Sequence, residues 1–147
     1  MENETAGKGV RDGRKGVIEL VPEGVAYPPK FGSPTALGVR AGDFIFISGM
    51  IAWNAERNIV GVGDCRAQTR QALHNMQVTL EQGGASLLDI VKISFYLTDI
   101  RQKAEIWEER KVIFGNARPA STLVEVSHLV DPQALLEIDA VAYAPLK

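Results

Sequence analysis

Two segments with a helical pattern, set among short segments with a strand pattern, constrain the fold of this chain most strongly. Apolar residues recur at helical spacing from 66 to 82, between Asp64 as the expected N-cap and Gly83-Gly84 as the end, and again from about 100 to 114, before Gly115. Six shorter segments are typical of strands: 17–21, 37–40, 44–48, 90–97, 121–128 and 135–143. This order predicts an α+β domain in which both helices pack on one face of a mixed, six-stranded sheet.

The opposite face of the predicted sheet has no helix left to cover it. That face must be solvated, shielded by loops or buried against another copy of the chain, and the abundance of Val, Ile and Leu favours another copy. The chain has 147 residues, of which 46% are hydrophobic, and this is enough for one hydrophobic core. We therefore expect a single domain over residues 17–147.

Residues 1–16 precede the first predicted strand and differ from the rest in composition. They carry four basic residues among Gly, Glu and Asn, and they lack the apolar stretch of a secretion signal. We expect this segment to be a flexible arm. No part of the chain approaches the roughly 20 apolar residues that a membrane-spanning helix needs, so we expect a cytoplasmic protein with no membrane partner.

Charge and the distribution of His and Cys bear on several classes of function. Sixteen Lys and Arg against eighteen Asp and Glu give a formal net charge of −2, which argues against a nucleic-acid partner. His74, His128 and Cys65 lack the paired spacing of a zinc site, so we expect no metal. Cys65 lies beside a helix start, and it is either a small apolar filler or a thiol with a lowered pKa.

The last predicted strand carries two acidic residues, Glu137 and Asp139. Strand geometry places both on one face, roughly 7 Å apart, with apolar residues on the other face. If one of them is partly buried, its raised pKa suits proton transfer or water positioning near neutral pH. The alternative is a solvated strand face with two acids that have no chemical role.

Several segments between about residues 32 and 144 have a characteristic order and spacing. They are Ser48-Gly49 at a strand end, Gln68-Thr69 and Asn75 in the first helix, Val91-Lys92, 119–126 with Leu129, and 137–142. Together they resemble the Rid (reactive-intermediate deaminase, YjgF-like or L-PSP endoribonuclease-like) family. The resemblance implies a chorismate-mutase-like fold and a homotrimer with ligand clefts between neighbouring subunits.

The resemblance also implies a chemistry. Family members with an assigned activity hydrolyse enamines and imines to ketones and ammonia without metal or cofactor. In them, an arginine of a Pro-Ala-Arg-Ser motif pairs with the substrate carboxylate, and a glutamate of the last strand positions the attacking water. Glu137 falls on that glutamate.

The chain departs from the family pattern at several expected site positions. Ser121 replaces the carboxylate-binding arginine, Met50 replaces a glutamine, Trp107 replaces an asparagine, and the family's tyrosine falls near 33–34. The chain therefore resembles a branch that lacks the arginine. Serine cannot supply the bidentate contact that arginine makes with a carboxylate, so this branch is expected to prefer a neutral or ring-bearing molecule.

The candidate site consists of one catalytic residue and a set of binding residues. Glu137 is expected to hold the water, and the substrate-binding candidates are Ser48, Gly49, Trp107, Arg118, Ser121 and Leu123. Three of these have simpler explanations, since Leu123 and Trp107 suit core packing and Arg118 suits an exposed loop.

The sequence predicts hydrolytic deamination of a reactive imine or enamine other than a simple 2-imino acid, at a cleft between subunits. The first alternative is a small-molecule-binding or stress-response trimer of the same fold without catalysis. The second alternative is an endoribonuclease or translation inhibitor, against which the acidic charge balance counts.

Overall fold

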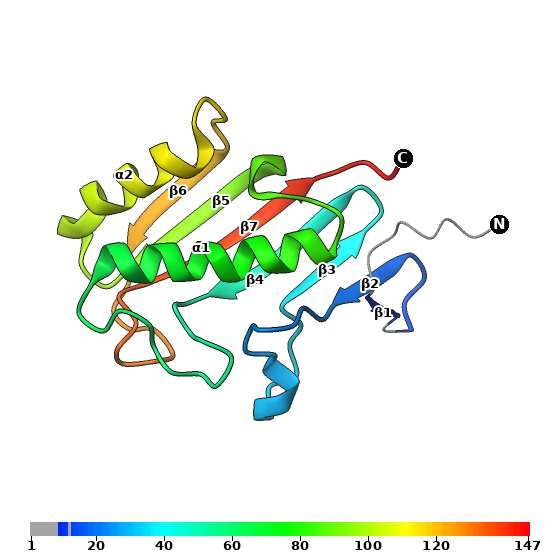
Figure 1. The fold of residues 1–147 in the computed structure, drawn as a ribbon, viewed down its shortest axis with the longest axis horizontal. Helices are drawn as coiled ribbons and strands as arrows, with labels where there is room; N and C mark the ends of the chain where they lie inside the picture. Colours follow the sequence, from blue (N-terminus) through cyan, green and yellow to red (C-terminus); the bar gives the residue numbers. More distant parts are fainter. Residues whose placement is uncertain (1–8, 12) are drawn as a thin grey trace.

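The computed structural model describes residues 9–11 and 13–147, which form one sheet with two α-helices on it (Figure 1). The strands are β1 (Val10–Arg11), β2 (Val17–Leu20), β3 (Gly38–Ala41), β4 (Phe44–Met50), β5 (Ile90–Leu97), β6 (Ala120–Glu125) and β7 (Leu136–Tyr143). The helices are α1 (Cys65–Gln82) and α2 (Lys103–Phe114), with short 3-10 turns at Pro28–Phe31, Leu87–Asp89 and Ile100–Gln102.

The strands lie in the order β1-β2-β3-β4-β7-β5-β6, and every neighbouring pair is antiparallel except β5 and β6. The predicted α+β class and the six predicted strands are confirmed as β2 to β7. The sheet has one further strand, because β1 pairs with β2. These two residues lie inside the segment 1–16 that we predicted as a flexible arm, whereas residues 1–8 and 12 of that segment lie outside the described residues.

Both helices lie on the same face of the sheet, as predicted (Figure 1). The carboxylate of Asp64 accepts a hydrogen bond from the Ala67 amide at 3.0 Å and caps the start of α1. The second helix begins later than predicted, because residues 100–102 form a 3-10 turn before α2 starts at Lys103. It ends where predicted, at Gly115, whose φ of 53° favours glycine.

The hydrophobic core fills the space between the sheet and the two helices. Its most buried side chains include Ile45, Ile93, Phe95, Leu97 and Ile138 from strands and Leu73, Met76, Leu80 and Ile106 from helices. Burying one such side chain contributes about 1.5–3 kcal/mol to folding. Cys65 is also buried here, and burial raises the pKa of its thiol to about 11. It is therefore the apolar filler of the two alternatives.

The opposite face of the sheet carries no helix (Figure 1). The aromatic rings of Phe44, Phe46 and Tyr143 lie on it, each with close to half of its surface exposed, and the Phe44 and Tyr143 rings are 5.2 Å apart. We call this the open face. At one end of the sheet, β6 is an edge strand, and five of its six residues are exposed.

Candidate functional site

The side chain of Glu137 lies against the backbone of Gly49 on the open face. Glu137 is on β7, and the ladder between β7 and β4 shifts register between Ile47 and Met50. This irregularity places Gly49 beside the carboxylate. A Cβ built on Gly49 would overlap Oε1 of Glu137 and would lie 2.8 Å from its Cδ. Any side chain at position 49 would therefore displace the carboxylate, so the structure brings these two predicted site residues together.

Glu137 and Asp139 share the open face, as the strand pattern predicts, but their surroundings differ. The Tyr96 hydroxyl donates a hydrogen bond to Asp139 at 2.9 Å, and this bond raises the pKa of Tyr96. Among the described residues, none donates a hydrogen bond to Glu137. Glu137 is half-buried, and this burial, reinforced by the charge of Asp139, raises the pKa of Glu137. The structure thus favours the partly buried acid over the solvated pair.

A cavity of about 420 Å³ opens beside Gly49, the glycine that contacts Glu137, although Glu137 itself does not line it. Ser48, Gly49 and Met50 form one wall of it, and loop residues that include Phe31, Ser33, Thr35, Ile51, Trp53, Arg57 and Val130 form the rest. The Ser48 hydroxyl donates its hydrogen to the Ala36 carbonyl at 2.6 Å. Its oxygen therefore remains available as an acceptor. We call this space the acid-side cavity.

Two buried amide side chains of α1 hold the loops around the acid-side cavity. Asn75 donates to the carbonyls of Ile51 at 3.3 Å and Trp53 at 2.8 Å. Gln68 donates to the carbonyl of Gln133 at 3.0 Å and accepts from the amide of Leu135 at 2.8 Å. The sequence marks both residues only through the family resemblance, and the structure assigns them a positioning role.

Sequence reasoning missed an aromatic and cationic cluster at the rim of the acid-side cavity. The guanidinium of Arg57 lies 4.2 Å from the ring centroid of Trp53 and 4.9 Å from that of Phe31. The Trp53 indole in turn donates to the carboxylate of Asp131 at 2.8 Å. The sequence indicates only a polar turn at 54–58, and nothing in it shows which way Arg57 would point.

The remaining predicted site residues lie on the other side of the sheet. In the parallel ladder, Ser121 pairs with Ile93 and Leu123 pairs with Phe95. Because Ile93 and Phe95 face the helices, Ser121 and Leu123 face them too. The structure therefore does not bring Ser121 next to Glu137 within one chain. Leu123 is partly buried against the core, which supports its packing explanation.

A second cavity, of about 320 Å³, lies at the end of α2 on this helix side. It is lined by Trp107, Arg110, Lys111, Phe114, Gly115, Ala117, Arg118 and Pro119, and we call it the cation-side cavity. Arg110 donates from Nη1 to the Ser121 hydroxyl at 2.9 Å, and its guanidinium lies 4.8 Å from the centroid of Phe95. Trp107 is 47% exposed, so it lines a cavity and does not fill the core.

Arg110 was also missed by sequence reasoning, which considered Arg118 as the source of positive charge near Ser121. Both arginines line the cation-side cavity, but only Arg110 contacts Ser121. The spacing of Arg110 and Trp107, three residues apart on α2, is the signal that could have indicated a shared helix face.

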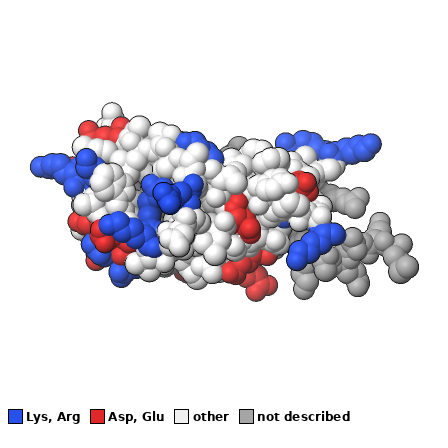
Figure 2. Space-filling view, turned by 90° about the horizontal axis from the view of Figure 1, so that it is seen from above, with Lys and Arg blue, Asp and Glu red and all other residues white. Residues whose placement is uncertain are grey.

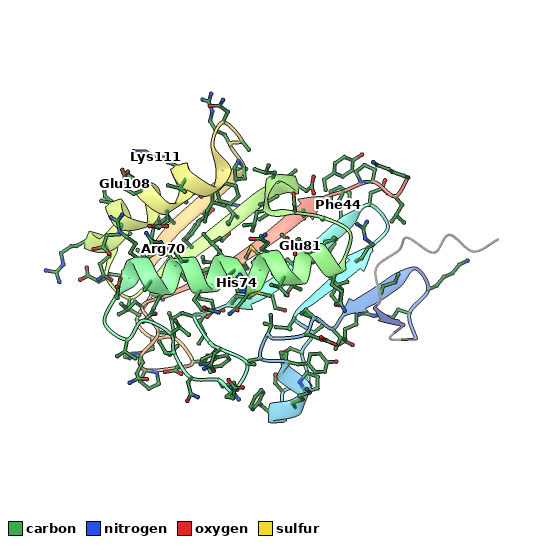
Figure 3. The ribbon with its side chains drawn as sticks, in the orientation of Figure 1. Phe44, Arg70, His74, Glu81, Glu108 and Lys111 are labelled. Atoms are coloured by element: carbon green, nitrogen blue, oxygen red, sulfur yellow. The ribbon has the colours of Figure 1, made fainter. Side chains whose placement is uncertain are left out.

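Other predictions concern metals, membranes and His74. In the described part of the chain, no three His, Cys, Asp or Glu side chains gather as a possible metal site. The helices described are too short or too polar to cross a bilayer. His74 lies on the exposed surface of α1 (Figure 3).

Comparisons with known proteins agree with this architecture. Residues 32–144 match the family model described as Endoribonuclease L-PSP. A RutC family protein of Pyrococcus horikoshii is 39% identical over 78% of this chain and 90% of its own length. The 3-aminoacrylate deaminase RutC of Acinetobacter baylyi is 33% identical over 84% of this chain and 95% of its own length.

Solved structures show the same fold. Rv2704 of Mycobacterium tuberculosis, a member of the YjgF/YER057c/UK114 family, superposes with a TM-score of 0.72 at 34% identity, over 85% of this chain and 98% of that one. TdcF of E. coli, solved with bound serine, has a TM-score of 0.76 at 27% identity, over 85% of this chain and 97% of that one.

Proposed function

Because the chain belongs to the Endoribonuclease L-PSP family, also known as the YjgF or Rid family, we propose that it hydrolyses a reactive imine or enamine to a ketone and ammonia. One observation carries this proposal. Glu137 is half-buried, has no hydrogen-bond donor among the described residues, and lies against a glycine that leaves room for it. A carboxylate in this state is suited to accept a proton from water. The 3-aminoacrylate deaminase among the relatives supports the reaction class.

In the proposed reaction, Glu137 accepts a hydrogen bond from a water molecule and orients its oxygen toward the carbon of a protonated imine. As the water oxygen bonds to this carbon, one water proton passes to Glu137 and the electron pair of the C=N bond moves to nitrogen. Glu137 then returns the proton to nitrogen. The C–N bond breaks with its electrons on the departing ammonia, and the remaining hydroxyl loses its proton to solvent as the ketone forms. An enamine enters the same sequence after its β-carbon takes a proton from solvent.

The complete site is proposed to form between copies of the chain. Glu137 lies on the open face, whereas Ser121 and Trp107 lie on the helix side, so a small molecule cannot contact both groups within one protomer. Proteins of the YjgF family are commonly trimers that bind small molecules. A homotrimer would cover the exposed rings of Phe44, Phe46 and Tyr143 and would bring the two groups together.

The test is an assay of ammonia and ketone release from imines that an amino-acid oxidase generates in the reaction mixture. The Glu137→Gln variant keeps the size of the side chain but cannot take a proton, and we expect its rate to fall by about 10²–10⁴-fold. Glu81→Gln is the matched control, since Glu81 is an exposed residue of α1 (Figure 3).

Three results would contradict the proposal. A folded Glu137→Gln protein with the wild-type rate would remove Glu137 from the mechanism. Binding of small molecules by the wild type without any turnover would favour the non-catalytic trimer. Cleavage of RNA by the wild type, lost in Glu137→Gln, would favour the endoribonuclease.

A further inference from the structure

The backbone conformation of Arg57 is unusual for an arginine. Among the residues that the structure describes, Arg57 is the only one other than glycine with a positive φ, at 64°. Asn54 supplies the hydrogen bonds of this turn, since its carbonyl accepts from the Arg57 amide at 3.0 Å and its side chain accepts from the Asn58 amide at 2.9 Å. Glycine would adopt this backbone with less strain. The turn itself therefore does not require an arginine, and we look for the reason in the side chain.

The Arg57 guanidinium has N–H donors that no residue of the described chain uses. The rings of Trp53 and Phe31, with centroids at 4.2 and 4.9 Å, hold it at the rim of the acid-side cavity. No described oxygen accepts a hydrogen bond from it. Many Lys and Arg side chains gather at the α2 end of the molecule (Figure 2), whereas Arg57 lies on the turn between β4 and α1. A guanidinium has five N–H donors, so Arg57 is suited to bind an acceptor atom of a ligand.

The walls of the acid-side cavity are mainly apolar. Its apolar lining residues include Val25, Leu37, Met50, Ile51 and Val130. Its volume of about 420 Å³ lies in the range of about 300–1,000 Å³ that is usual for small-molecule pockets. A short-chain imine would leave much of this space empty, whereas a planar ring would bury its faces against these side chains.

Gly49 connects this cavity to the proposed reaction. The glycine lines the cavity and also lies against the carboxylate of Glu137. An imine carbon placed beside Glu137 therefore has the cavity next to it. A substituent on that carbon can extend past Gly49 toward Arg57.

Two carboxylates make the rim less suited to an anion. Glu56 and Asp131 line the adjoining cavity together with Trp53 and Arg57. An anionic group bound at Arg57 would approach both of these negative charges, and like charges brought together weaken binding. A neutral acceptor, such as a ring nitrogen or a ring carbonyl, would bind the guanidinium without this repulsion.

We propose that Arg57 is a specificity-determining residue: the acid-side cavity binds a neutral, planar ring of the substrate, and Arg57 donates a hydrogen bond to an acceptor atom on that ring. The inference rests on the proposed function and names its substrate class, an imine or enamine that carries such a ring. The sequence predicts a neutral or ring-bearing molecule from the loss of arginine at position 121, and the proposal assigns the ring to a particular cavity.

The test is a calorimetric comparison of three neutral ketones on the assembled protein. The probes are 1-(pyridin-4-yl)propan-2-one, 1-phenylpropan-2-one and butan-2-one, at a mildly alkaline pH that keeps the pyridine neutral. We expect the wild type to bind the phenyl ketone about 10-fold more tightly than butan-2-one, because the ring is buried. The pyridyl ketone should bind about 10-fold more tightly again, because its nitrogen accepts from a charged donor.

Three variants separate the acceptor contact from the ring contact. Arg57→Gly removes the donors but suits the left-handed backbone, so it should fold and bind the pyridyl and phenyl ketones equally. Arg101→Gly, the control with the same substitution at an exposed arginine, should keep the preference for the pyridyl ketone. Phe31→Leu changes a partly exposed wall residue and should reduce the preference for the phenyl ketone over butan-2-one about 3-fold.

The proposal is wrong if the wild type binds butan-2-one as tightly as the phenyl ketone, or if Arg57→Gly keeps the preference for the pyridyl ketone. It is also wrong if 4-(2-oxopropyl)benzoate binds more tightly than the pyridyl ketone, because Arg57 would then be an anion contact. The ketones are not turned over, so these results do not depend on catalysis. A protein with the expected binding preferences but no imine hydrolysis would contradict the proposed function alone.

Discussion

Glu137 and Arg110 lie on opposite faces of one sheet and differ in the partner that each lacks. Glu137 has no hydrogen-bond donor among the described residues, whereas Arg110 has no acidic partner among them. Burial raises the pKa of the acid and lowers the pKa of the arginine, because both charges are withdrawn from water. The acid lacks a donor and the arginine lacks an acidic partner, but the sheet lies between them within one protomer. This difference is why we propose that the chemistry is divided between two protomers.

The largest expected effect comes from combining two variants in one assembly, one without the acid and one without the arginine. Glu137→Gln and Arg110→Gln, co-expressed with different tags and purified as mixed trimers, should recover about a third of the wild-type activity if each site takes its acid and its arginine from different copies, because one of the three sites in any mixed trimer then has both intact residues. Assemblies of either variant alone should stay inactive. The assay of ammonia release measures this directly, and no recovery in the mixed assemblies would place both groups in one protomer.

The next largest effect concerns the glycine beside the acid. Gly49→Ala adds a Cβ where the Glu137 carboxylate lies, so the carboxylate must move. We expect kcat to fall by about 10²-fold, since a displacement of about 1 Å costs this much in a positioned catalytic group. An alanine variant with unchanged kcat would show that the position of the acid is not critical.

Removing the hydrogen bonds that hold the loops around the acid-side cavity tests whether these loops contact the substrate. Asn75→Ala removes two hydrogen bonds to the carbonyls of Ile51 and Trp53 and leaves those buried groups unpaired. We expect the free energy of unfolding to fall by about 1–3 kcal/mol and KM to rise several-fold, both measurable by urea denaturation and steady-state kinetics. An unaffected KM would mean that these loops do not contact substrate.

The smallest expected effect is on pH dependence. Glu137 acts as a base, so the rate falls as the pH drops through its raised pKa, where the carboxylate gains a proton. Asp139→Asn removes the neighbouring negative charge, lowers the pKa of Glu137, and should move the acidic limb of the kcat/KM profile to lower pH by less than about one unit. The same raised pKa affects the free energy of unfolding in the opposite direction to the rate. Because the pKa of Glu137 is higher in the folded than in the unfolded protein, the folded protein becomes less stable as the pH rises through this range. Glu137→Gln should therefore unfold at a higher temperature than the wild type at neutral pH.

The sequence predicts the fold well because its elements have distinct ends and periods. Asp64, Gly83 and Gly115 mark three helix ends, and the alternation in β7 correctly places Glu137 and Asp139 on one face. The start of α2 was less predictable, since a 3-10 turn and an α-helix share the same local pattern at their junction.

The candidate site is less predictable because it depends on register and on contacts between distant elements. A shift of one residue in the β5–β6 pairing would move Ser121 to the open face, and only the structure fixes that register. The contact of Gly49 with Glu137 depends on the register shift in β4 between Ile47 and Met50, which no residue pattern predicts. The family resemblance identifies Ser121 as a candidate site residue, but it does not indicate that Arg110 of α2 contacts it.

The edge position of β6 has a further consequence for how the protein behaves in solution. This strand ends the sheet, and five of its six residues are exposed. An uncovered edge of this kind accepts a foreign strand as readily as a proper neighbour. Protein that is kept as separate protomers should therefore become turbid on warming sooner than protein that is kept assembled.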